Sequence, residues 1–105
     1  MAVTEVAPQM RMLLAHIEGE TIDQKIGHLL DHELRRRLQA CEQEILELEI
    51  RYGMMYDEFL TQLQAGGLGD PFSYPLETDA IRWEDLVAEK QEWLSQLKAI
   101  QDLRR

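Results

Sequence analysis

Apolar residues recur with the period of an α-helix along most of this chain. From residue 34 onward they follow alternating steps of four and three, the heptad spacing of packed helices. The positions concerned are Leu34, Leu38, Cys41, Ile45, Leu48, Tyr52 and Met55. Neither Gly nor Pro interrupts residues 28–52, and Thr21 and Asp23 suit the cap and first turn of a helix. The pattern predicts one long helix over residues 21–52.

Gly53 stands where this helix should end, because a helix C-terminus favours a residue that tolerates positive φ. Beyond it, apolar residues spaced i, i+3, i+4, i+7 predict a short helix over residues 55–65, with Asp57 and Glu58 in its first turn. The apolar face changes direction at Gly53. The pattern therefore favours a corner over one continuous helix, in which the glycine would cost about 1 kcal/mol.

Three further segments complete the predicted order. Residues 66–78 hold three glycines and two prolines and predict a loop, whose Phe72, Tyr74 and Leu76 we expect to pack on the corner. A last helix over residues 79–103 follows, capped by Thr78 or Asp79. Its predicted seam is Trp83, Leu86, Lys90, Trp93, Leu97 and Ile100. Residues 1–20 predict an N-terminal arm or a short helix that starts near Pro8 and ends at Gly19.

These elements predict an all-α protein with a single domain over residues 1–105. The expected architecture is an antiparallel helical hairpin made of a long central helix, a short corner helix and a long C-terminal helix. Leu46 and Ile50 lie about half a turn from the heptad seam, so the long helix is apolar on two sides. We interpret this as the middle position of a three-helix arrangement; the alternative is a face reserved for another chain.

The chain is strongly acidic, with 20 acidic against 11 basic side chains, a formal net charge of −9 and a pI near 4.7. Residues 42–92 contain 13 acidic residues and three basic ones. Such a charge disfavours binding to phosphate backbones and favours a basic protein partner. The single cysteine, Cys41, and the lack of a signal-peptide or membrane-spanning pattern lead us to expect a cytoplasmic protein that does not enter a membrane.

Few residues suggest chemistry. His28 and His32 have the i, i+4 spacing of two zinc ligands, but surface histidines are far commoner. Cys41 lies on the seam and is expected to be a buried thiol. Weak candidates for nucleic-acid contacts are Arg35, Arg36 and Arg37 together with Arg104 and Arg105, which an antiparallel hairpin brings close; ion pairs with Asp31 and Glu33 are the simpler interpretation. We expect no enzyme activity, no cofactor and no metal.

Three segments, HELRRRL, RYGMMYDEF and ETDAIRWEDL, occur in a distinctive order. They resemble a group of small helical prokaryotic proteins encoded beside predicted ribonuclease toxins, the antitoxin-like members of toxin–antitoxin pairs. The group's pattern, E-[IL]-R-R-[KR]-L, then K-Y-G-M-S-[FY]-[ED]-E-F, then D-x-x-x-W-E, maps onto Glu33–Leu38, Arg51–Phe59 and Asp79–Glu84. Met55 departs from it, since a serine would cap the short helix there. The resemblance covers residues 25–103 and implies a partner-binding role.

Two functions follow as hypotheses. The first is an antitoxin-like protein that binds a basic toxin, with docking residues Leu46, Ile50, Met54, Tyr56 and Phe59 and carboxylates that guide the encounter. The second is a homo-oligomeric scaffold whose second apolar face is its own interface. In either case we expect a homodimer.

Overall fold

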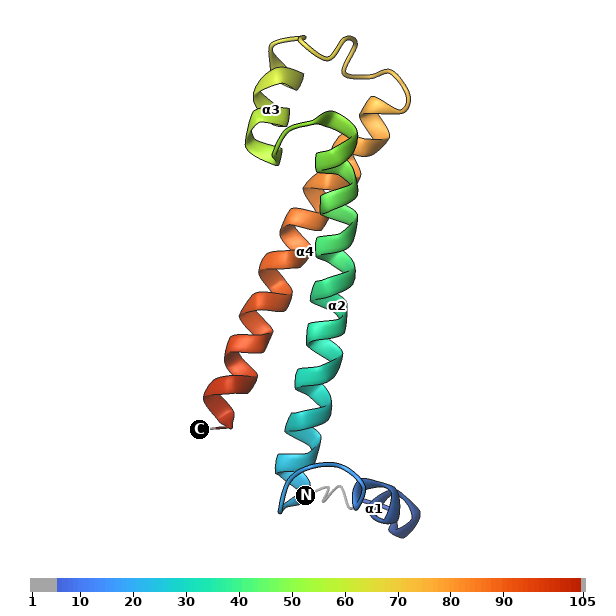
Figure 1. Ribbon diagram of the computed structural model, residues 1–105, viewed down its shortest axis with the longest axis vertical. Coiled ribbons are helices and arrows are strands. Elements are labelled where there is room, and N and C mark those ends of the chain that lie inside the picture. The colour runs from blue at the N-terminus through green and yellow to red at the C-terminus, as the bar shows by residue number, and fades with distance from the viewer. Residues whose placement is uncertain (1–5, 105) are drawn as a thin grey trace, which may run out of the picture.

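A computed structural model of the protein describes residues 6–104. It contains four helices, α1 (Pro8–Leu14), α2 (Ile22–Tyr52), α3 (Tyr56–Gln64) and α4 (Leu76–Leu103), and no strand within that range. The two long helices, α2 and α4, lie side by side and run antiparallel (Figure 1). The short α3 and the loop after it close one end of the hairpin, and α1 lies at the other end. The prediction of an all-α hairpin is confirmed.

Local chemistry sets both ends of α2. The Thr21 hydroxyl accepts a hydrogen bond from the Gln24 backbone N–H at 3.1 Å, and the Gln24 side chain accepts one from the Thr21 N–H at 3.3 Å. This reciprocal capping box satisfies two amides that the first turn leaves free. At the other end, Gly53 adopts the left-handed conformation with φ 67° and ψ 26°. The predicted start at Thr21 and corner at Gly53 are both confirmed.

The predicted start of α4 and the predicted end of α1 need correction, whereas α3 and the end of α4 lie within one residue of their predicted bounds. Helix α4 begins at Leu76, with Pro75 at the cap position, so neither Thr78 nor Asp79 caps it. The Asp79 carboxylate instead accepts hydrogen bonds from Arg51 and Tyr52 of α2. Helix α1 ends at Leu14, earlier than expected, and Gly19 lies in the linker that follows.

The core lies at the closed end of the hairpin, which we call the head. Its buried residues come from α2, α3 and α4 and are Cys41, Leu48, Phe59, Leu76, Trp83 and Leu86. The Trp83 and Phe59 ring centroids are 4.6 Å apart, and Tyr52 meets the Phe59 ring edge-on at 4.9 Å. Large aromatic side chains bury much apolar surface each, so this cluster fixes α3 across the ends of the long helices.

Three aromatic or apolar predictions at the head fail. Phe72 and Tyr74 are largely exposed, and only Leu76 packs onto the core. The loop is held by its own hydrogen bonds, including one from the Phe72 N–H to the Asp70 carboxylate at 3.0 Å. Met55 is also exposed, because α2 ends before the heptad reaches it. It occupies the cap position of α3 without a side-chain hydrogen bond, as the departure from serine predicts.

The molecule is elongated, with principal dimensions of 59 × 28 × 24 Å. Its radius of gyration is 20.1 Å, whereas a compact domain of this length has about 13 Å. It exposes 8055 Å² of surface, against about 6100 Å² for a compact monomer of its mass. A two-helix rod leaves the outward face of each helix in solvent, so these faces are where interactions with other molecules become possible.

Candidate functional site

An exposed apolar strip lies beside the head, on the outward face of α2 and the turn after it. We call Leu46, Ile50 and Met55 the outer strip; their side chains are 46%, 72% and 70% exposed. Leu46 and Ile50 lie two residues before and after the buried Leu48, so they point away from α4.

The predicted three-helix arrangement is wrong, because none of the helices between residues 6 and 104 covers this face. Helix α3 packs on the head, and α1 lies at the opposite end of the rod (Figure 1). The outer strip therefore matches the alternative interpretation, a face that the chain itself leaves uncovered.

Carboxylates border the outer strip on both sides. Glu42 and Glu49 flank it on one side and Glu47 on the other, as their positions around the helix require. None of these three carboxylates forms an ion pair with any residue between 6 and 104. The shallow hollow along this side of the hairpin is lined by Gln39, Glu42, Gln43, Ile45, Leu46, Glu49, Met55 and Lys90.

The surplus of negative charge in this half of the molecule is not neutralised internally. Of the three basic residues in segment 42–92, Arg51 pairs with Asp79 at 2.9 Å and Arg82 pairs with Glu44 at 2.8 Å. The two hydrogen bonds that Arg82 donates to Glu44 hold the pKa of the Glu44 carboxyl below its usual range. Eleven of the thirteen carboxylates of the segment, and only Lys90 among its cations, remain outside any ion pair of the described residues.

The other predicted docking residues lie in or against the head. Phe59 has no exposed surface, so it cannot touch a partner and its role is to hold α3 in place. Met54 and Tyr56 are half-buried and pack against the same cluster. Burial raises the pKa of the Tyr56 phenol above its ordinary value. Met55 was not among the predicted docking residues, because the heptad pattern assigned it to the buried seam.

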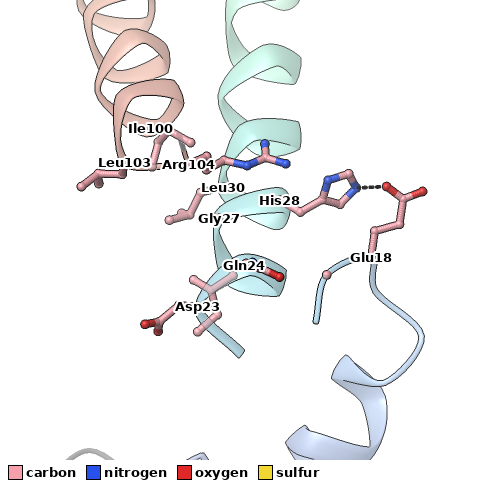
Figure 2. Close-up of a pocket in the computed structure, with 11 residues that line it drawn as sticks. Glu18, Asp23, Gln24, Gly27, His28, Leu30, Ile100, Leu103 and Arg104 are labelled. Atoms are coloured by element: carbon pink, nitrogen blue, oxygen red, sulfur yellow. Dashed lines mark ion pairs between the residues drawn. The ribbon is translucent and has the colours of Figure 1, made fainter. Parts of the chain in front are cut away.

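The two histidines lie on one side of α2, near its start. The His28 and His32 rings are 4.7 Å apart at a tilt of 56°, and His28 Nε2 lies 3.9 Å from the Glu18 carboxylate (Figure 2). Within residues 6–104, no three His, Cys, Asp or Glu side chains gather in a way that could hold a metal ion. The acidic neighbours Asp31 and Glu33 bind arginines instead.

The arginine run forms ion pairs, as the simpler interpretation predicted. Arg36 donates two hydrogen bonds to Glu33, at 2.7 and 2.9 Å, and Arg37 donates a third at 2.9 Å. These guanidinium groups lower the pKa of the Glu33 carboxyl to about 2. Arg37 also lies over the Trp93 ring, at 5.3 Å from its centroid. The run is thus turned toward the protein's own carboxylates.

Arg35 and Arg104 share the remaining carboxylate. Asp31 accepts a hydrogen bond from Arg35 at 2.6 Å and lies 3.4 Å from Arg104, which joins the end of α4 to α2. These contacts, chiefly the Arg35 hydrogen bond, lower the pKa of Asp31. The structure confirms that an antiparallel hairpin brings Arg104 near the run. Arg105 lies outside the described residues.

Cys41 is a structural thiol of the core. Its Sγ donates a hydrogen bond to the Leu86 carbonyl at 3.1 Å, and burial raises its pKa. A nucleophilic cysteine needs the opposite shift, because the thiolate is the reactive form.

A second apolar surface lies at the open end of the hairpin and was not predicted. Ile26 and Leu30 of α2 face Ile100 and Leu103 of α4 across a groove of about 710 Å³ (Figure 2). The Arg104 side chain crosses α2 at Gly27, and its Cγ and Cδ lie 3.5 Å from the position that a Cβ would take there. We call this surface the open-end groove.

Comparisons of the chain with protein-family models, with curated proteins and with solved structures found no match. Among the described helices, none combines the length and the apolar character that crossing a membrane requires.

Proposed function

We propose that this chain is a non-enzymatic protein-binding module, an antitoxin-like protein that neutralises a cognate basic toxin by direct binding. One observation supports it above the others: the outer strip is apolar, exposed and bordered by carboxylates that form no ion pair with any of the described residues. The resemblance of segments 33–38, 51–59 and 79–84 to antitoxin-like proteins points in the same direction.

The two kinds of surface have separate roles in such a complex. Apolar side chains contribute affinity, at about 25 cal/mol for each Å² removed from water. The carboxylates raise the association rate with a basic partner and make it sensitive to salt. The partner surface that fits has apolar side chains flanked by Lys or Arg. Leu46 and Ile50 supply the apolar contacts, with Met55 at their end.

Pairing of the outer strip with a second copy of itself is less favourable. It would bring Glu42, Glu47 and Glu49 of two chains together, and like charges across an interface are repulsive. The homo-oligomeric scaffold remains the second candidate because the rod exposes far more surface than a compact monomer. Its interface would have to lie elsewhere than the outer strip.

The test is binding to the product of the gene adjacent to the one that encodes this chain, where that product is basic. Leu46→Asp and Ile50→Asp place a charge on the strip, and we expect each to weaken binding about tenfold or more. Ile81→Asp is the matched control. Ile81 is exposed on α4 and lies two residues before the buried Trp83, so it points away from the hairpin. Calorimetry and an assay of toxin inhibition give the readouts.

Two results would overturn the proposal. If the folded Leu46→Asp and Ile50→Asp proteins bind as well as the parent chain, the outer strip is not the docking surface. If the basic neighbour product neither binds the parent chain nor loses toxicity in its presence, the antitoxin role is wrong.

A further inference from the structure

We infer that the open-end groove of one chain binds helix α1 of a second copy, and that the reciprocal exchange of the two α1 helices makes a symmetric dimer. This inference is independent of the proposed function, since it concerns the opposite end of the rod from the outer strip.

The open-end groove has no cover of its own. Helix α4 ends at Leu103, and the first turns of α2 extend past this point, so no described helix lies beside them on the α4 side (Figure 2). Leu103 is 82% exposed, and Ile26 and Leu30 are also exposed. Two helices that diverge around apolar side chains form a site for a third helix, which would complete a small three-helix core.

Helix α1 is a matching segment, because the described part of the chain leaves three of its four large apolar side chains exposed. Only Leu14 is buried, whereas Met10, Met12 and Leu13 are exposed, Leu13 by 65%. Met10 and Leu13 lie three residues apart, so they share one face of the helix. A seven-residue helix is not stable in water without packing, so its apolar face needs a partner.

Helix α1 does not reach the groove of its own chain. It lies on the far side of α2 from α4 (Figures 1 and 2). The linker after it is held there by a 2.6 Å hydrogen bond from Lys25 Nζ to the Ile17 carbonyl and by the Glu18–His28 contact. The open-end groove and helix α1 lie at the same end of the hairpin. The groove of one chain can therefore accept helix α1 of another.

Charge and area agree with this occupant. Arg11 of α1 has no ion pair among the described residues, and the groove lining contains Glu18 and Asp23. Arg104, the one cation of the lining, is already paired with Asp31. The surface that the chain exposes in excess of a compact monomer, about 2000 Å² over the whole rod, is larger than the roughly 800 Å² that each partner contributes to a standard interface. In a reciprocal exchange each chain makes the same contact with the other, so the assembly has two-fold symmetry and is complete with two copies.

The experiment is light scattering coupled to size exclusion on the full chain over a wide range of concentrations. We expect a dimer, and we expect Leu13→Asp and Leu103→Asp each to raise its dissociation constant about tenfold or more. Both side chains are exposed in one chain, so neither change disturbs the hairpin, which circular dichroism verifies. Ile81→Asp, an equally charged change at an exposed position of α4, leaves the dimer intact.

A mixing experiment identifies the occupant. The Leu13→Asp chain retains a normal groove and the Leu103→Asp chain retains a normal α1. Mixed together, they can form one native contact per heterodimer, so the mixture dimerises more tightly than either variant alone.

Three outcomes would overturn the inference. A parent chain that stays monomeric shows that the groove is empty or filled by its own α1. A Leu13→Asp dimer as stable as the parent shows that α1 is not the occupant. Mixing without any recovery shows that α1 of one chain does not contact the groove of the other.

Discussion

At the scale of single residues, Asp79 joins the two long helices at the head. Its carboxylate accepts hydrogen bonds from Arg51 at 2.9 Å and from the Tyr52 hydroxyl at 2.5 Å, and the residue is nearly buried. Arg51 and Tyr52 end α2, whereas Asp79 lies in the first turn of α4. These three side chains therefore fix the end of α2 against the start of α4.

Removal of this carboxylate should cost more than removal of a surface partner. We expect Asp79→Asn to lower the free energy of unfolding by about 2 kcal/mol, because the amide removes the negative charge that pairs with Arg51 and one of the two oxygens that accept from Arg51 and Tyr52. Glu44→Gln is the matched control. Its ion pair with Arg82 also links α2 to α4 but is well exposed, so the expected loss is below about 1 kcal/mol. Urea denaturation followed by circular dichroism measures both; equal losses would contradict the role of Asp79.

The ionisation of the Tyr52 phenol reports on its contact with Asp79. Burial, together with the Asp79 hydrogen bond, raises the pKa of the phenol from 10.0 to about 12. The folded-state pKa is the higher one, so this contribution to stability is complete below pH 10 and is lost as the pH rises through 12. We expect the ultraviolet titration of the tyrosines to contain a component near pH 12 that is absent in Tyr52→Phe. An unchanged curve for that variant would contradict the assignment.

At the scale of the elements, Gly27 inside α2 and Gly53 at its C-cap differ in how an added side chain would affect them. Gly53 ends the helix with φ 67°, and no atom would touch an added Cβ, so its constraint is conformational alone. Gly27 lies inside the helix, where a Cβ would meet the Arg104 side chain at the ordinary contact distance of 3.5 Å.

We expect Gly53→Ala to destabilise the protein by about 1 kcal/mol, the cost of a left-handed conformation in a residue with a Cβ. Gly27→Ala should stabilise it by up to about 1 kcal/mol, because glycine is the poorer residue in a helix interior. Thermal unfolding of the two variants beside the parent chain measures both signs. A loss of stability in Gly27→Ala would show that Arg104 cannot adjust at that crossing.

The sequence predicts those features of the elements that local chemistry decides. Thr21 with Gln24 and the glycine at position 53 act through neighbours within a few residues, so the start of α2 and the corner were predictable. Asp79 resembles a helix cap by the same rules. Its predicted role as a cap was wrong because its partners, Arg51 and Tyr52, come from another helix. Phe72 and Tyr74 carry no periodic signal, and their exposure followed from no rule of sequence.

The two candidate surfaces were likewise predicted only as far as local pattern determines them. Periodicity predicted that Leu46 and Ile50 point away from the seam, but it cannot tell whether another helix covers them. The open-end groove was missed because it depends on where α4 stops relative to α2, which the lengths of α3 and the loop determine. Exposure of an apolar face is a property of the assembled hairpin, not of any one segment.

At the scale of the whole molecule, packing is concentrated at one end of a 59 Å rod. The head holds the fully buried Trp83, Phe59 and Leu86. Toward the open end the two helices diverge (Figure 1), and the lining of the groove between them includes the exposed apolar residues Ile26, Leu30 and Leu103. Stability within a protein follows buried contact density, so the hairpin should open from this end while the head stays folded.

Hydrogen exchange measures this gradient. We expect the slowest amide exchange in residues 41–52 and 80–90, which pack at the head, and faster exchange in residues 22–30 and 97–104 beside the open-end groove. Dimerisation through exchanged α1 helices covers that groove. Raising the protein concentration should therefore slow exchange in residues 8–14, 22–30 and 97–104 and leave the head unchanged, and Leu103→Asp should shift this dependence to concentrations about tenfold higher or more. Uniform exchange along the rod would show instead that the hairpin unfolds as one cooperative unit, with the open end as well supported as the head.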